Sequence, residues 1–193
     1  TGISSGTTTL FIAVFKLAII FSSDNLKPIC FVFLFISNIL NLSLANTRAR
    51  LRMTTLYYFA GLHGFLVAGT GNKVEDFGVG FFTKYGDGGV DVSPIADLVK
   101  SEVRLLAEFL KVPESILKAK PTDGLFGDDR SDEDQIGANY DELEWAMNQI
   151  ENGKTLEDFS GREAEVFKIY KRLNTINQHK MNPIPICKIP KNI

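Results

Sequence analysis

Apolar side chains recur every three or four positions over residues 46–60, the spacing that places them on one face of an α-helix. They are Ala49, Met53, Leu56, Tyr57 and Ala60. A short apolar run at 65–68 then predicts a strand, and the turn at Gly71 and Asn72 leads into a second predicted helix from Lys73. The order strand, loop, helix is typical of open parallel sheets, in which ligands bind at the carboxyl ends of the strands.

The second half of the chain has the pattern of further helices. The longest is predicted to begin with Ser93 as its N-cap and Pro94 at its first position, and to continue to Leu110. Its apolar stripe consists of Ile95, Leu98, Val99, Val103, Leu106 and Leu110. Pro113 ends this helix and begins a shorter helical turn. The remaining predictions, in chain order, are a polar loop over 122–134, a helix over 140–150, a helix over 160–176 that opens with a capping box of Ser160 and Glu163, and an extended tail from Met181.

The first 45 residues are far more apolar than the rest. Their only charged residues are Lys16, Asp24 and Lys27. The apolar runs 10–21 and 29–40 are each shorter than the ~20 residues that span a membrane, and Lys16 interrupts the first. Residues 1–9 lack the basic start of a signal peptide. We therefore predict buried strands or helices of an open α/β sheet here, with a membrane anchor as a minor alternative.

Composition excludes several classes of partner. With 45% hydrophobic residues and 23% charged ones, the 193-residue chain fits a single folded domain. Its 21 basic and 23 acidic residues nearly balance, so it lacks the basic field that nucleic-acid binding requires. Cys30 and Cys187 lie far apart without metal-ligand spacing, which indicates neither a zinc site nor a disulfide framework. A reducing cytoplasm is the expected location.

Three segments contain residues suited to nucleotide binding. Residues 1–9 form a loop of serine, threonine and glycine, although it lacks a Walker lysine. The glycine-rich stretch 69–91 allows close backbone approach to a ligand, and its charged residues include Glu75, Lys84, Asp87 and Asp91. The third segment is Lys100 within its helix, followed by Pro121-Thr-Asp123. Taken singly, each has a simpler explanation, as a flexible end, a solvated turn or a surface lysine.

Together, several short segments closely resemble the ammonia-dependent NAD synthetases in order and spacing. They are Asn46-Thr-Arg-Ala-Arg-Leu-Arg-Met53, Gly69-Thr-Gly-Asn-Lys-Val-Glu75, the string Phe-Phe-Thr-Lys-Tyr-Gly-Asp-Gly-Gly at 81–89, Pro121-Thr122, Ser131-Asp-Glu-Asp134 and His179-Lys180. The string at 81–89 is highly specific, and the family-like part of the single domain covers 46–183. The resemblance implies an α/β fold with a Rossmann-like (adenine nucleotide alpha hydrolase-like) parallel sheet flanked by helices, incomplete at the N-terminus, in a homodimer. It also implies adenylation of deamido-NAD by ATP with Mg²⁺, and displacement of AMP by ammonia.

Matching the family's motifs position by position implies candidate roles. The residues that match ATP contacts are Ser4, Gly6, Thr9, Thr70, Lys100 and Thr122. Those that match deamido-NAD contacts are Arg50, Lys84, Asp91, His179 and Lys180, and Glu75 matches a magnesium ligand. Lys100 is the implied catalytic residue, because it would shield the ATP α-phosphate from the attacking carboxylate. Arg50 and Lys84 would mainly orient the anionic dinucleotide.

The front loop departs from the family's Ser-Gly-Gly-x-Asp-Ser pattern. The matching stretch reads Ser4-Ser-Gly-Thr-Thr-Thr9, so Thr8 stands where the family has a metal-binding aspartate. Weakened electrostatic stabilisation of this kind typically lowers a rate by ~10²–10³. Two hypotheses follow: an active NAD synthetase, and a non-catalytic relative that dimerises and binds dinucleotide without turnover. A third, another ATP pyrophosphatase such as a GMP or argininosuccinate synthetase, is disfavoured by the string at 81–89.

Overall fold

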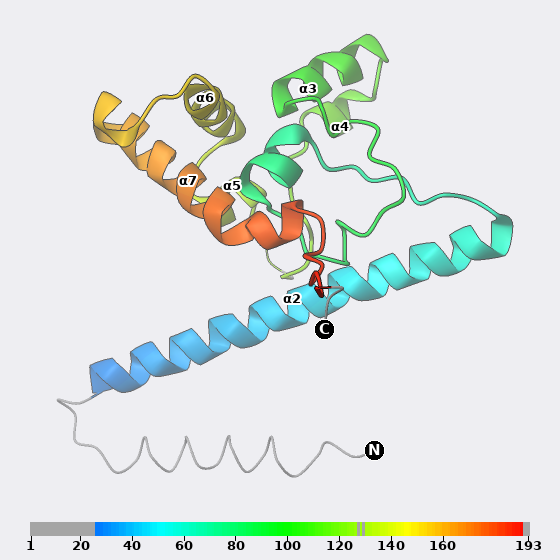
Figure 1. Cartoon of the computed structure of the whole chain (residues 1–193), viewed down its shortest axis with the longest axis horizontal. Coiled ribbons are helices and arrows are strands. Elements are labelled where there is room, and N and C mark those ends of the chain that lie inside the picture. The colour runs from blue at the N-terminus through cyan, green and yellow to red at the C-terminus, as the bar shows by residue number, and fades with distance from the viewer. Residues whose placement is uncertain (1–25, 127, 129, 191–193) are drawn as a thin grey trace. The chain divides into compact units, whose positions relative to one another are not determined.

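The computed structural model of the chain describes residues 26–126, 128 and 130–190, and their side chains from residue 39 onward (Figure 1). The chain divides into two compact units, residues 1–44 and residues 45–193. The cores and the cavity described below belong to the second unit. The apolar run 10–21 and the candidate residues Ser4, Gly6 and Thr9 lie outside the described residues.

The described residues are mainly helical. The elements in chain order are α2 (Leu26–His63), the π-helix η2 (Lys73–Val79), α3 (Lys100–Phe109), α4 (Glu114–Leu117), α5 (Asp132–Ile136), α6 (Tyr140–Glu151), the 3₁₀-helix η3 (Leu156–Asp158) and α7 (Gly161–Met181). In the same part of the chain, β-pairing is limited to an isolated parallel bridge between Ala68 and Val92. The helices predicted over 46–60 and 140–150 are confirmed, whereas the wider parallel sheet stays a prediction.

The helix predicted from Pro94 in fact begins at Lys100. Residues 94–98 form turns instead, with the Leu98 N–H donating to the Ile95 carbonyl at 3.1 Å. The Leu98 carbonyl accepts a hydrogen bond from the Lys73 N–H (2.8 Å), so it is engaged by η2. The Glu102 side chain accepts the Val99 N–H (2.9 Å) and caps the helix six residues later than predicted. A tertiary contact therefore replaces the local start signal.

The predicted strand over 65–68 is wrong in extent. Phe65 and Leu66 are 70% and 73% exposed and belong to no strand. Pairing is limited to the next residues, where the Gly69 N–H donates to the Val92 carbonyl at 2.7 Å. The Val67 N–H is taken by a carboxylate oxygen of Asp91 (2.9 Å) rather than by a neighbouring strand. A side-chain acceptor thus replaces a backbone one for the Val67 N–H, while the Val67 carbonyl accepts the Asp91 N–H at 2.9 Å.

Helix α7 extends five residues beyond the predicted end at residue 176. Side chains from its last turns hold carbonyls at the end of η2: Asn174 donates to Gly78 (2.7 Å) and Asn177 to Val79 (2.8 Å). These tertiary contacts stabilise the last turns of α7, which lie beyond the end predicted from the apolar spacing. The predicted capping box at its start is wrong, because Ser160 makes no side-chain cap hydrogen bond.

The polar loop predicted over 122–134 also ends early, since α5 begins at Asp132 with Ser131 as its cap. The Ser131 side chain accepts the Asp134 N–H at 3.1 Å. The tail after Met181 has no helix or strand through residue 190, which agrees with the predicted extended tail.

The main core lies between η2, α6 and α7, which pack against one another (Figure 1). Its buried residues are Val74, Val79, Ile136, Ala138, Tyr140, Leu143, Ala146, Val166 and Tyr170. Asn72, 1% exposed, anchors η2 because its side-chain oxygen accepts the N–H groups of Val74 (3.0 Å) and Glu75 (3.1 Å). The cap fixes the first turn of η2, which carries two carboxylates toward the candidate site.

Helix α2 buries only a narrow face in the second unit, where Ala45 and Ala49 pack with Leu125. Ile39 and Leu40, from the apolar run predicted to be buried, are 49% and 57% exposed, so that prediction is wrong at these positions. Within the described residues, no helix combines the length and apolar character of a membrane span.

Candidate functional site

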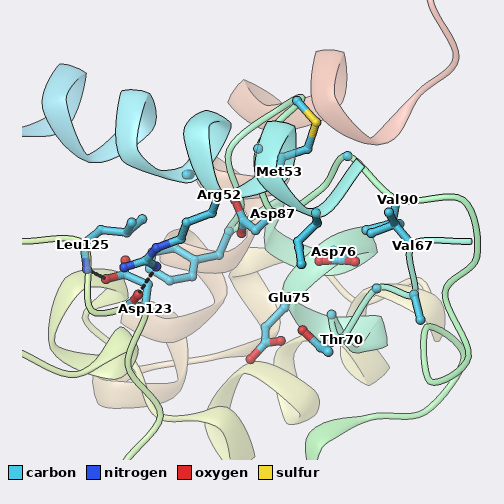
Figure 2. Close-up of a pocket in the computed structure, with 18 of the residues that line it drawn as sticks. Arg52, Met53, Val67, Thr70, Glu75, Asp76, Asp87, Val90, Asp123 and Leu125 are labelled. Carbon is cyan, nitrogen blue, oxygen red and sulfur yellow. Dashed lines mark hydrogen bonds between the residues drawn. The ribbon is translucent and has the colours of Figure 1, made fainter. Parts of the chain in front are cut away.

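A cavity of about 360 Å³ opens beside the first turn of η2. Its walls come from the C-terminal half of α2, the segments 67–71 and 86–90, η2 itself, and the segment that carries Asp123 and Asp132. Figure 2 shows the arrangement, with Arg52 reaching from α2 to the backbone of Asp123. The acidic lining residues are Glu75, Asp76, Asp87, Asp123 and Asp132. The charged groups of the lining are thus these five carboxyl groups and the guanidinium of Arg52.

An ion pair links Glu75 of this lining to Lys100, the first residue of α3. The Lys100 ammonium lies 2.9 Å from Glu75 Oε1, and the two side chains are only 22% and 14% exposed. The Tyr140 hydroxyl donates to the same oxygen. The Glu75 Oε2 atom accepts a long hydrogen bond of 3.4 Å from the Asn72 N–H. The predicted catalytic lysine and the predicted metal ligand are therefore direct neighbours in this structure.

Two further carboxyl groups of the lining are difficult to ionise. Burial, together with the charges of Asp123 and Glu75, raises the pKa of Asp132 to about 6. Burial, together with the charges of Glu75 and Asp87, likewise raises the pKa of Asp76 to about 6. Asp132 is 9% exposed, and its Oδ1 atom is buried without a hydrogen-bond partner. An orphaned carboxylate oxygen in an acidic cavity suits a cation or a hydrogen-bond donor on a ligand.

These residues fit a hard cation that a nucleotide helps to hold. Among the described residues, no group of three His, Cys, Asp or Glu side chains lies close enough to form a complete metal site. Mg²⁺ is usually bound by one or two carboxylates with waters and substrate phosphates, so a full protein cage is not required. Glu75 and the unpartnered oxygen of Asp132 would supply such oxygen ligands.

Four of the five candidate dinucleotide residues come together in a second group, which we call the basic cluster: Arg50, Lys84, His179 and Lys180. Arg50 donates to the Lys84 carbonyl at 3.3 Å, and the Lys84 ammonium donates to the His179 carbonyl. Lys180 donates to the carbonyls of Gly80 (2.9 Å) and Phe82 (2.8 Å). Burial lowers the pKa of Lys180, against the opposing effect of Asp87. The cluster joins α2, the end of α7 and the segment between them.

The segment 83–89 is pressed against α2, which brings the basic cluster and the cavity into one region. The Thr83 hydroxyl donates to the Asn46 side chain at 2.6 Å. A Cβ at Gly86 would lie 2.9 Å from the Ala49 Cβ, so glycine is required for this close approach. The Thr83 N–H donates to Asp87 Oδ1 (2.9 Å), which closes the turn.

The remaining predicted residues lie in separate contacts. Asp91 accepts hydrogen bonds from the Tyr57 hydroxyl and the Val67 N–H, both at 2.9 Å, and is not part of the basic cluster. Thr70 lines the cavity. Thr122 donates to the Arg130 carbonyl at 3.3 Å, within the segment that leads to α5.

Sequence reasoning missed several polar residues of the region, namely Tyr140, Asp132, Asp76 and Arg52. Tyr140 is the first residue of α6, which the helical pattern marks only as a start, whereas Asp132 begins α5 inside the segment predicted as a polar loop. Their approach to Glu75 depends on how these helices pack against η2, which periodicity does not encode. For Asp132 a signal was present, because it lies in the Ser-Asp-Glu-Asp segment used for the family resemblance.

The family model described as NAD synthase matches residues 12–184. The chain belongs to the NAD synthase family. The match begins at residue 12, ahead of the family-like part 46–183 that the motifs cover. Among curated relatives, the NH(3)-dependent NAD(+) synthetase of Picrophilus torridus is 45% identical over 150 residues, covering 77% of this chain and 54% of the relative. That of Methanococcoides burtonii is 49% identical over 109 residues, covering 56% of this chain and 41% of the relative.

Solved structures of this family resemble the chain as well. An NMN synthetase from Francisella tularensis superposes with a TM-score of 0.63 at 30% identity, covering 86% of this chain and 64% of that protein. An NH3-dependent NAD synthetase from Campylobacter jejuni gives a TM-score of 0.57 at 27% identity, covering 76% and 56%. The chain spans about half the length of the curated relatives it matches.

Proposed function

We propose that this NAD synthase family member is an ATP-dependent ligase that amidates the carboxylate of deamido-NAD with ammonia, giving NAD, AMP and diphosphate. The observation that carries the proposal is the Lys100–Glu75 pair at an acidic cavity, next to a basic cluster, in a chain of this family. The cavity would take the triphosphate of ATP, and the basic cluster would take the anionic dinucleotide. ATP and deamido-NAD would then meet in the second unit.

The reaction needs two displacements. A carboxylate oxygen of deamido-NAD attacks the α-phosphorus of ATP, and the bond to diphosphate breaks, which leaves an acyl adenylate. Ammonia then attacks the acyl carbon, AMP departs with the bonding electrons, and the nitrogen loses a proton. Lys100 would lie against the phosphates and lower their repulsion of the attacking oxygen. Arg50 and Lys84 would hold the dinucleotide in line, which is an orienting contribution.

Mg²⁺ would neutralise charge on the phosphates, with Glu75 and Asp132 as its protein ligands. Both carboxyl groups line the cavity, and carboxylate oxygens are ligands that Mg²⁺ prefers, which supports this assignment. Thr8, in the position of the family's aspartate, would reduce the number of carboxylates that hold the ion. A rate lower by ~10²–10³ than that of a chain with the aspartate is the expected consequence.

The second candidate is the non-catalytic relative, which the threonine at position 8 favours. It would bind deamido-NAD through the basic cluster and form no AMP. A variant of the first proposal has nicotinate mononucleotide as the substrate instead of deamido-NAD, because the Francisella tularensis neighbour is an NMN synthetase. Nicotinate mononucleotide would carry the same reacting carboxylate and one phosphate fewer.

The homodimer is proposed as well. Exposed apolar side chains on the C-terminal part of α2 are its candidate interface: Leu51, Leu56, Tyr58, Phe59 and Leu62. Contiguous apolar patches on a protein surface mark interaction sites, which is the basis of this proposal. We also propose a cytoplasmic location, where the ATP and ammonia that the proposed reaction consumes are available.

The test is mass-spectrometric detection of NAD, AMP and diphosphate from deamido-NAD, ATP, Mg²⁺ and ammonium. Parallel reactions receive nicotinate mononucleotide in place of deamido-NAD. Lys100→Ala should abolish turnover, whereas Lys118→Ala, an exposed lysine that pairs with Glu114, is the matched control and should retain it. Dinucleotide binding without any AMP in the unaltered chain would establish the non-catalytic relative instead.

A further inference from the structure

The side chain of Tyr140 contacts both members of the Lys100–Glu75 pair. Its hydroxyl donates to Glu75 Oε1, the same oxygen that Lys100 approaches at 2.9 Å. The Lys100 ammonium also lies 4.5 Å from the centroid of the Tyr140 ring. One residue of α6 therefore touches an anion with its polar end and a cation with its aromatic face.

Tyr140 is held firmly where it makes these contacts. It is 1% exposed and belongs to the main core between η2, α6 and α7. Its backbone N–H donates to Glu133 Oε1 at 3.0 Å, and the Asn139 cap fixes the start of its helix. A tyrosine hydroxyl is protonated at neutral pH, so it can donate to the Glu75 carboxylate.

In the proposed function, Lys100 would turn from Glu75 toward the nucleotide phosphates, because their larger negative charge attracts its ammonium group. Glu75 Oε1 would then lose Lys100 and keep the Tyr140 hydroxyl. Among the described residues, Glu75 Oε2 accepts one long hydrogen bond, from the Asn72 N–H at 3.4 Å, so it is the oxygen more available to a cation. Without Tyr140, the carboxylate would have no strong contact left to orient it.

We propose that Tyr140 is a positioning residue that keeps Glu75 directed into the cavity for a divalent cation while Lys100 turns to the nucleotide phosphates. The inference rests on the proposed function, because it assumes that ATP binds at this cavity. In this proposal Tyr140 acts through Glu75, to which its hydroxyl donates. Its effect should therefore appear in the binding of metal-loaded ATP and be absent from the binding of free ATP.

The experiment is calorimetric titration of the full chain with ATP, once with Mg²⁺ and once with a chelator. Tyr140→Phe removes the hydroxyl and keeps the ring over Lys100. We expect about tenfold weaker binding of Mg²⁺-ATP, the usual scale for losing a hydrogen bond to a charged group, and less than about twofold change for free ATP. Tyr170→Phe is the matched control, because Tyr170 is a buried tyrosine of the same core with no contact to Lys100 or Glu75 among those described. Its affinities should stay within about twofold of the unaltered chain in both titrations.

A purely structural role would lower the stability of Tyr140→Phe and leave the ratio of the two affinities unchanged, which would overturn the proposal. A double variant with Glu75→Gln sharpens the test. Once Glu75 no longer binds the cation, adding Tyr140→Phe should cause no further loss of Mg²⁺-ATP affinity. A further loss of tenfold in that background would also overturn it.

A ligand-free measurement separates this inference from the proposed function. Acetylation of Lys100 in the absence of nucleotide, followed by mass spectrometry, should be several-fold faster in Tyr140→Phe, because an unanchored Glu75 holds the ammonium less firmly. Tyr170→Phe should leave the rate unchanged. If the unaltered chain binds no ATP, the proposed function fails. Equal acetylation rates in Tyr140→Phe and the unaltered chain would overturn the positioning role independently.

Discussion

Replacing Lys100 by methionine should destabilise the fold measurably, because it leaves Glu75 as a buried charge without a cation. Breaking a fully buried pair on one side typically lowers the free energy of unfolding by about 3–5 kcal/mol. Here the side chains are 22% and 14% exposed, and the Tyr140 hydroxyl still donates to Glu75. We therefore expect a smaller loss of about 2 kcal/mol. Methionine keeps an apolar stem against the Tyr140 ring, so the loss reports on charge rather than on packing.

The assay is urea unfolding followed by the fluorescence of Trp145, the chain's single tryptophan, which packs against the main core. Lys118→Met, at a lysine side chain that is 74% exposed, should change the free energy of unfolding by less than about 0.5 kcal/mol. The double variant with Glu75→Gln should recover about 1–2 kcal/mol, because no charge then stays buried and unpaired. Equal effects of Lys100→Met and Lys118→Met, or strict additivity in the double variant, would refute the reasoning.

Three further predictions concern the same unit. Folding raises the pKa of Asp132 to about 6, so the folded state binds the carboxyl proton more tightly than the unfolded chain does. The protonated Asp132 side chain therefore contributes stability below about pH 4, and this contribution is lost as the pH rises through 6. In urea titrations at pH 7.5, Asp132→Asn should accordingly be more stable than the unaltered chain by up to about 3 kcal/mol. This gain should shrink at pH 4.5, and a gain that does not depend on pH would contradict the reasoning. Gly80→Ala should lower the melting temperature far more than Gly153→Ala. Both glycines have positive φ, but only a Cβ at Gly80 would lie 2.5 Å from the Asn177 Cβ. Equal shifts in melting temperature would show that this contact is absent. Arg162→Met breaks an exposed ion pair with Glu142 (2.7 Å) and should alter the free energy of unfolding by less than about 1 kcal/mol, a limit that urea titration can check.

The helices were predictable where their apolar spacing is long and regular, as in 46–60 and 140–150. Their boundaries were less so. The start of α3 shifts to Lys100 because the Leu98 carbonyl bonds to Lys73, a partner far away in sequence. The end of α7 moves to Met181 because asparagine side chains bind carbonyls of η2. Tertiary hydrogen bonds decide both boundaries, and local patterns carry no record of them.

The candidate site was predictable in part for the same reason. Motif matching named Lys100 and Glu75, which the structure brings into contact. It did not name Tyr140 or Asp132, whose importance depends on packing and on burial rather than on residue type. Asp91, which motif matching grouped with the basic residues, instead binds Tyr57 and the Val67 backbone.

The most direct test of the account is a crystal structure of the chain soaked with ATP, Mg²⁺ and deamido-NAD. The account predicts the triphosphate in the cavity beside η2, with Lys100 on the phosphates and Glu75 on the ion, and the dinucleotide against Arg50 and Lys84. Electron density for both nucleotides elsewhere, with the Lys100–Glu75 pair still closed, would contradict it.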